Sequence, residues 1–229
     1  MKRRLRLINF ILMFVMCFGA LGFMPRVVEA ALPTDLFISE YIEGSGYYKA
    51  IEIYNGTGVS IDLSSYSLEL YSNGSPTVSQ TLSLNLGLPL LSNNDVLVLV
   101  HGSAVQELKD LADVINSTVI NFNGDDAVVL RKGGIVLDVF GVIGTDPGTA
   151  WTGGGLSTAD RTLVRKATVC SGDPIGSDAF DPSVQWEGYP TNTISNIGSH
   201  TASCAPADTA PTVTGTSPAD GATKVAPRQ

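Results

Sequence analysis

The stretch from Val119 to Ile143 constrains the fold more than any other part of the chain, because it alternates short apolar runs with two kinds of turn. The Asn123–Asp126 segment supplies glycine and short polar side chains, which tolerate a tight reversal of the chain. Gly133-Gly134 supplies a two-residue loop whose glycines permit the positive φ of a hairpin turn. These features predict a three-stranded meander, and its nearly continuous apolar runs predict that both faces are covered or that a second sheet packs on it.

Short apolar runs recur outside the meander and are separated by turns rich in glycine, asparagine and proline. One short helix is predicted where Ser103 and Gln106 have capping-box spacing. In total the pattern indicates about eight to nine strands, which is typical of an all-β sandwich. The strands predicted outside the meander are Leu36–Ile42, Ala50–Tyr54, Tyr66–Tyr71, Val78–Leu84, Asp95–Val100 and Arg161–Lys166.

Three blocks of this sequence resemble bacterial lamin-tail domains and come in that family's order. The blocks are Leu36–Gly44 with Lys49–Asn55, then Phe122–Leu130 with Asp138, Gly141–Gly144 and Asp146–Gly148 before Trp151, and finally Arg161–Lys166. The resemblance covers residues 36–204. It implies an immunoglobulin-like β-sandwich without catalysis. In secreted bacterial proteins the family looks like an accessory unit, often placed ahead of an extracellular nuclease or phosphoesterase domain.

The first 30 residues have the pattern of a signal peptide and not of a folded element. A basic head precedes the apolar run Leu7–Met24, and small residues lie before Ala31. We expect cleavage between Ala30 and Ala31, and hence a protein that is secreted or displayed at the cell surface, with no membrane segment after cleavage. The alternative is an uncleaved membrane anchor, because the apolar run is near the lower limit for spanning a bilayer.

Residues 31–204 are predicted to form one lamin-tail-like β-sandwich domain. The composition changes after Cys204, so residues 205–211 are interpreted as a linker. Residues 212–229 resemble the first strand and turn of a bacterial immunoglobulin-like repeat. A single strand cannot bury its apolar face, so we interpret the chain as a fragment of a longer polypeptide, with a disordered tail as the alternative.

The cysteines predict one disulfide. Cys17 leaves with the signal peptide, which leaves Cys170 and Cys204 as a pair in an exported chain. Their bond would close a loop of about 35 residues, for which chain entropy gives at most roughly 4 kcal/mol. The alternative is two free thiols.

The charge balance disfavours binding to nucleic acids. The chain has 14 basic and 22 acidic residues, of which the signal segment holds five basic residues and Glu29. The remainder carries 9 basic and 21 acidic residues, a net charge of 9 − 21 = −12. Because nonspecific affinity for nucleic acids depends on Lys and Arg that neutralise phosphates, we expect no direct nucleic-acid binding by this module.

The residues needed by an extracellular hydrolase are scarce. The chain has two histidines, His101 at a strand end and His200 in a loop. We interpret them as surface or capping residues, and a His–Asp pair formed across the fold is the alternative. No HExxH, CxxC, GxSxG or phosphate-loop spacing occurs. We therefore predict no catalytic residue, no metal ligand and no cofactor.

Adjacent carboxylates at Asp125 and Asp126, with Asn121 and Asn123 nearby, could present several oxygens to calcium. The spacing is not that of an EF-hand, and tight turns select the same residue types, so turn chemistry is favoured and calcium stays open. Other carboxylates near the first predicted hairpin are interpreted in the same way: Glu40, Glu43 and Glu52.

Trp151 and Trp186 are both predicted to lie in loops rich in glycine and proline. Either tryptophan could anchor a binding surface or stack on a sugar, but burial at the ends of the sandwich is favoured. The sequence thus predicts a non-catalytic binding or spacer domain of an exported bacterial multidomain protein. Its partner would be an unidentified protein, a cell-surface component or a polysaccharide. The alternative is the N-terminal part of a secreted nuclease or metallophosphoesterase whose catalytic domain lies downstream of residue 229.

Overall fold

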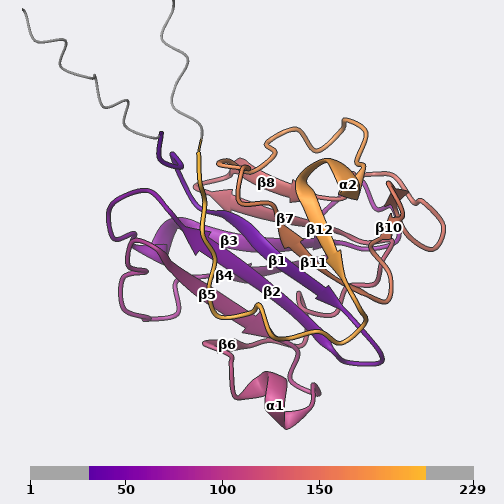
Figure 1. Cartoon of the computed structure of the whole chain (residues 1–229), viewed down its shortest axis with the longest axis horizontal. Coiled ribbons are helices and arrows are strands. Elements are labelled where there is room, and N and C mark those ends of the chain that lie inside the picture. Colours follow the sequence, from indigo (N-terminus) through magenta and orange to yellow (C-terminus); the bar gives the residue numbers. More distant parts are fainter. Residues whose placement is uncertain (1–30, 205–229) are drawn as a thin grey trace, which may run out of the picture.

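The computed structural model describes residues 31–204, which form two β-sheets packed face to face (Figure 1). The predicted signal peptide, the predicted linker 205–211 and the predicted repeat 212–229 lie outside the described residues, and Ala31 is the first residue inside them. Within residues 31–204, no helix is long and apolar enough to cross a bilayer.

The larger sheet has six strands: β1 (Phe37–Glu43), β2 (Lys49–Asn55), β5 (Asp95–Val100), β6 (Val114–Ile115), β11 (Arg161–Arg165) and β12 (Trp186–Tyr189). Their order across the sheet is β12-β11-β1-β2-β5-β6, and every pair is antiparallel except β5–β6. Every residue of β1 and β2 is buried. Both faces of the sheet centre are therefore covered, which explains why these strands lack alternation of polar and apolar residues.

The smaller sheet has the order β4-β3-β7-β8. Its strands are β3 (Tyr66–Tyr71), β4 (Gln80–Ser83), β7 (Ala127–Lys132) and β8 (Ile135–Phe140), and a separate short hairpin consists of β9 (Thr152–Gly153) and β10 (Leu156–Ser157). Gly133 and Gly134 join β7 to β8 with φ values of 54° and 85°. The two-glycine hairpin predicted from the sequence is confirmed, because both residues adopt the positive φ that such a turn requires.

The prediction that the first segment of the meander forms a strand is wrong. Val119, Ile120 and Phe122 are completely buried, yet they form no strand. They pack as an irregular segment in the core between the sheets, and β7 instead pairs with β3, where Leu68 lies opposite Leu130. A short buried segment can have the apolar sequence of a strand and yet form no strand pairing. The periodicity of the sequence therefore did not distinguish a buried irregular segment from a strand.

The main core lies between the two sheets and takes side chains from both. At its centre the ring of Tyr41 stacks on Phe140 at 4.0 Å and on Phe122 at 4.8 Å between ring centroids. The irregular segment is thus held by an aromatic stack that also spans the sheets. Core residues of the larger sheet are Ile38, Tyr41, Ile51, Ile53, Leu97, Leu99, Val114, Leu163 and Trp186, and those of the smaller sheet are Tyr66, Leu68, Leu70, Val128, Leu130 and Phe140.

Two further apolar clusters cover the outer faces. Beyond the smaller sheet, Trp151 packs with Val129 and Val139. On the outer face of the larger sheet, Phe37 and Tyr54 form part of a cluster that includes residues after β12. We call residues 190–204 the C-terminal strap; in Figure 1 this orange-to-yellow segment runs across the larger sheet. The alternative prediction, that a second sheet packs on these strands, is confirmed for β7 and β8, whereas Ile135 at the start of β8 is exposed.

The helical segments are short: η1 (Leu63–Ser65), α1 (Gln106–Lys109) and α2 (Pro182–Gln185). Helix α1 lies where the sequence predicted a helix, but its N-cap is Val105, without a side-chain hydrogen bond, so the Ser103–Gln106 capping box is wrong. The sequence analysis did not predict α2, whose N-cap Asp181 accepts a hydrogen bond from the Ser183 amide. The immunoglobulin-like β-sandwich that the sequence analysis expected is confirmed.

Candidate functional site

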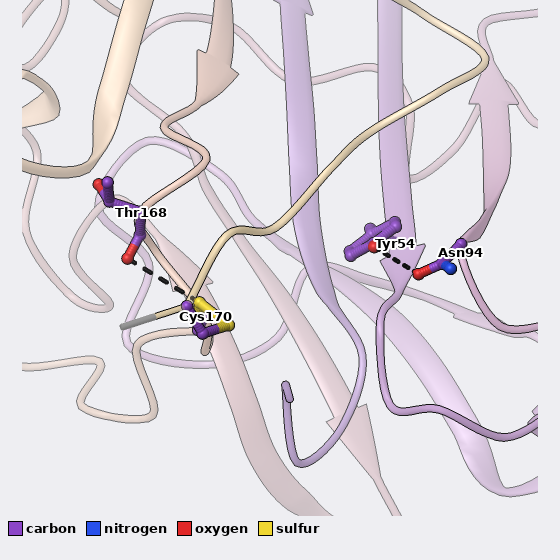
Figure 2. Close-up of a disulfide and its surroundings, with 5 residues drawn as sticks. Tyr54, Asn94, Thr168 and Cys170 are labelled. Carbon is purple, nitrogen blue, oxygen red and sulfur yellow. Dashed lines mark hydrogen bonds between the residues drawn. A yellow bond between two sulfur atoms is a disulfide. The ribbon is translucent and has the colours of Figure 1, made fainter. Parts of the chain in front are cut away.

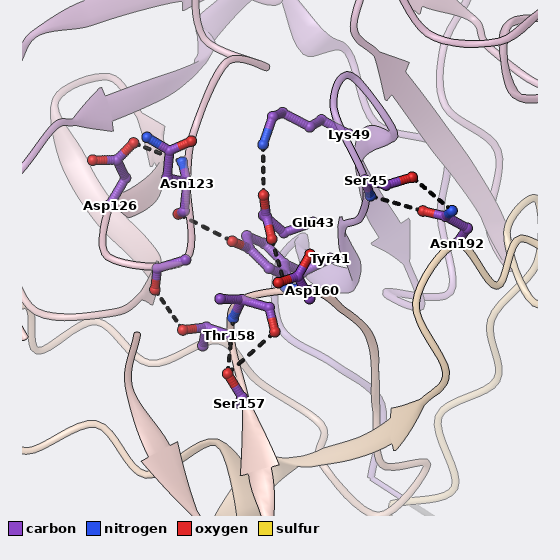
Figure 3. A network of polar contacts seen from close by, with 12 residues as sticks. Tyr41, Glu43, Ser45, Lys49, Asn123, Asp126, Ser157, Thr158, Asp160 and Asn192 are labelled. Carbon is purple, nitrogen blue, oxygen red and sulfur yellow. Dashed lines mark hydrogen bonds and ion pairs between the residues drawn. The ribbon is translucent and has the colours of Figure 1, made fainter. Parts of the chain in front are cut away.

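A polar network lies at the end of the sandwich where the β1–β2 hairpin meets two loops (Figure 3). Glu43 ends β1 and Lys49 begins β2 directly opposite it. The Lys49 ammonium donates to Glu43 Oε1 at 2.7 Å, and the two side chains are only 6% and 11% exposed. The other oxygen, Oε2, accepts from the Asp160 amide at 2.6 Å. Both carboxylate oxygens of Glu43 are therefore used to join the hairpin to the loop before β11.

Asp126 closes the loop that precedes β7. Its Oδ2 accepts from the amide of Asn123 at 2.7 Å, and its Oδ1 accepts from the amide of Asn73 at 2.7 Å. Burial raises the pKa of Asp126, while these two backbone hydrogen bonds oppose that rise. Asp126 thus performs the turn chemistry that the sequence favoured. It ties the loop to the turn after β3.

The neighbouring residues do not complete a cation site. Asp125 is partly exposed, although its Oδ1 is buried without a hydrogen-bond partner. Asn121 and Asn123 are exposed, and the main-chain carbonyl of Asn123 accepts from the hydroxyl of Tyr41. Across residues 31–204, no group of three or more His, Cys, Asp or Glu side chains is arranged to hold a metal ion.

The two histidines lie at opposite ends of the β1–β2 pair. His101 is buried beside the hairpin: its amide bonds to the Lys49 carbonyl, and its Nδ1 accepts from the Ser103 amide at 3.0 Å. Burial, followed by the charge of Lys49, lowers its pKa. His200 instead packs against Phe37 and Tyr54, the first cross-strand pair at the other end. The structure therefore does not bring the two imidazoles together.

A buried ion pair that sequence reasoning missed joins the two sheets. Asp138 on β8 pairs with Arg165 on β11 at 2.7 Å, and the side chains are 0% and 1% exposed. Asp138 also accepts from the amides of Ile38 and Asp173 at 2.8 Å each. The Arg165 guanidinium lies 4.4 Å above the ring of Trp186. The available sequence signal was a lone aspartate within the apolar run of β8, because a buried charge requires a partner.

The remaining residues singled out from the sequence have structural positions. Trp151 and Trp186 are 7% and 1% exposed, so the burial predicted for both is confirmed, although Trp186 lies in β12 and not in a loop. The structure joins Cys170 to Cys204 by the predicted disulfide, with their Cα atoms 5.6 Å apart (Figure 2). The bond attaches the end of the strap to the loop after β11.

Most basic side chains in the described chain already have partners. Residues 31–204 contain seven Lys and Arg, and four of them form ion pairs. A fifth, Lys166, donates to the carbonyls of Ser183 and Val184. Phosphate binding requires Lys and Arg side chains that can reach a ligand. Within residues 31–204, the two basic residues outside these ion pairs and hydrogen bonds are Lys109 and Arg161.

Comparison with known proteins gives one family match. The family model described as Lamin Tail Domain matches residues 29–144, slightly more than half of the chain. The match includes β1 to β8 and stops before β9, the strap and the disulfide. No curated protein and no solved structure matches the chain.

Proposed function

Because this chain belongs to the lamin tail domain family, we propose that it is a non-catalytic binding or spacer module of an exported bacterial multidomain protein. The observation that carries the proposal is that several candidate carboxylates form hydrogen bonds or ion pairs within the domain itself. Among the carboxylates that sequence reasoning considered for metal binding, Glu43, Glu52 and Asp126 are engaged in holding the fold. Glu43 and Asp126 each use both oxygens in contacts within the protein.

The same observation defines the class of partner. Phosphodiester cleavage needs positive charge, usually a metal, at the phosphate, and nucleic-acid binding needs basic side chains that displace counterions. A net charge of 9 − 21 = −12 for residues 31–229 repels phosphates. The ligand is therefore sought among proteins, cell-surface components and polysaccharides.

The test is to incubate purified residues 31–204 with plasmid and with single-stranded DNA at low salt, adding magnesium, calcium or manganese in turn. Gels then report cleavage and mobility shift. Low salt is chosen because it exaggerates electrostatic attraction. We expect neither cleavage nor retention. Metal-dependent nicking that survives repurification and is lost in His101→Ala or Asp125→Asn would overturn the accessory role and place an active site in this domain.

A further inference from the structure

Glu40 is a buried carboxyl group to which the fold gives no hydrogen-bond partner. The residue is 1% exposed, and neither of its side-chain oxygens has a partner among residues 31–204. A β-bulge in the pairing of β1 with β2 lies between Ile38 and Glu40. The bulge adds one residue to β1, so Ile38 and Tyr41 both face the main core while Glu40 faces outward. An ionised carboxylate in this position would be strongly unfavourable.

The cross-strand neighbours of Glu40 show that it lies beneath the strap. It pairs with Glu52 on one side and with Val164 on the other, and paired side chains share a face of the sheet. Oε2 of Glu52 accepts from the Gly198 amide of the strap at 2.7 Å. Val164 lines a surface pocket of about 310 Å³ together with strap residues, among them His200. One neighbour of Glu40 therefore bonds to the strap, and the other lines a pocket beside it.

Two amides in the middle of the strap, those of Gly198 and Ser199, bond to Glu52, and the other polar contacts lie near the ends of the strap. Near its start, Asn192 bonds with Ser45, and the hydroxyl of Thr191 donates to the Asp160 carbonyl. Thr162 donates to the Thr193 carbonyl at 2.8 Å, and the Ser203 amide donates to the Ala167 carbonyl at 2.6 Å. Ile197 packs into the outer apolar cluster. The end of the strap is fixed covalently through Cys204. Contacts thus hold the two ends of the strap at more points than its middle.

The charged groups around Glu40 do not offset a negative charge there. Glu52 on β2 adds a like charge, and Arg165 on β11 is paired with Asp138. His200 from the strap is neutral, because burial and then the charge of Arg165 lower its pKa to about 4. The outward side chains of β5 are valines. Burial, and then the charge of Glu52, raise the pKa of Glu40 to about 8.

We propose that the strap is a pH-operated latch, which opens when Glu40 loses its proton to solvent and uncovers the apolar outer face of the larger sheet. The face uncovered includes Phe37 and Tyr54, which the strap residue His200 contacts. The disulfide keeps the open strap tethered. The closed form holds a neutral carboxylic acid, whereas the open form gives the carboxylate water.

The difference in the pKa of Glu40 between the closed and the open strap determines how strap opening depends on pH. The pKa of Glu40 is raised in the closed form from its ordinary 4.5 to about 8, so the closed form binds the proton more tightly. The stabilisation of the closed strap is complete below pH 4.5 and decreases as pH rises towards about 8. The opening equilibrium constant therefore increases about tenfold per pH unit across this window and then becomes constant.

The test is hydrogen exchange in the purified, oxidised chain at pH 6, 7, 8 and 9. The reporters are the strap amides of Gly198 and Ser199, which bond to Glu52, with each rate divided by the intrinsic exchange rate at the same pH. We expect strap opening to increase about 50-fold from pH 6 to pH 8 and only about twofold more by pH 9. Glu40→Gln keeps the shape without the titratable group, and it should remove the slope.

The matched control is Glu187→Gln, because Glu187 is an exposed carboxylate that pairs with Val164 from the other side. This variant should keep the wild-type slope. Carboxyl NMR of the wild-type protein provides a measurement that needs no variant, and it should show Glu40 titrating far above the usual glutamate range. An ordinary glutamate titration, or the same pH slope in Glu40→Gln as in the wild type, would overturn the proposal.

Discussion

Replacing Asp138 with alanine should destabilise the domain by about 5 kcal/mol, because the change leaves the Arg165 guanidinium buried without its partner. Removing one member of a buried ion pair costs about 3 to 5 kcal/mol. The change also removes the acceptor of the Ile38 and Asp173 amides, and an unsatisfied buried donor costs a further 1 to 3 kcal/mol or so. Against a total stability of roughly 5 to 15 kcal/mol, this is a large fraction.

The assay is urea unfolding followed by tryptophan fluorescence, since Trp186 lies under the affected guanidinium. With a slope of roughly 2 kcal/mol per molar urea, the midpoint should fall by about 2.5 M. The double variant Asp138→Leu with Arg165→Leu should be more stable than Asp138→Ala, because it leaves no unpaired charge.

The matched control for this prediction is the partly exposed ion pair of Lys132 with Asp35, whose side chains are 42% and 22% exposed. Lys132→Gln should cost less than about 1 kcal/mol, because solvent screens such pairs. If Asp138→Ala shifted the midpoint no more than Lys132→Gln does, the inter-sheet ion pair would not have the stabilising role derived from its burial.

Two further predictions concern a turn and a histidine. Gly134→Val should cost about 1 to 3 kcal/mol, since a β-branched residue resists the φ of 85° at that position, and an unchanged urea midpoint would contradict the turn assignment. The pKa of His200 is lowered to about 4, so its contribution to stability is complete above pH 6.5 and is lost as pH falls towards 4. Allowing for its partial exposure, this loss is on the order of 2 kcal/mol. His200→Phe should therefore show a smaller decrease in the urea midpoint between pH 7 and pH 4 than the wild type, and an equal decrease would refute the assignment.

The elements that the sequence predicted well are those whose signals are local. The β7–β8 hairpin follows from Gly133-Gly134, and β1, β2, β3 and β5 follow from apolar runs bounded by turns. The irregular segment around Val119 was misassigned because burial, and not strand pairing, gives it its apolar character. Local sequence signals could not identify β3 as the distant strand that pairs with β7 in place of this segment.

The same limit applies to the polar groups. Asp126 was correctly associated with turn chemistry because its Asn123 partner is three residues away. The partner of Asp138, in contrast, lies 27 residues further along the chain and in the other sheet. The outward position of Glu40 depends on a bulge in β1, which reverses the alternation that a sequence pattern assumes.

The disulfide determines how a pulling force would pass through the domain. Phe37 begins β1 at the same end of the sheet at which Arg165 ends the neighbouring strand β11, and Cys170 follows shortly afterwards. Tension applied at Cys204 passes through the covalent bond into the loop after β11 and bypasses the weakly fastened strap. Tension between the two ends then acts on β1 and β11 at the same end of the sheet. The rest of the domain lies to one side of the line of force and is not stretched along it. While the disulfide holds, such a domain adds little contour length between its own two ends.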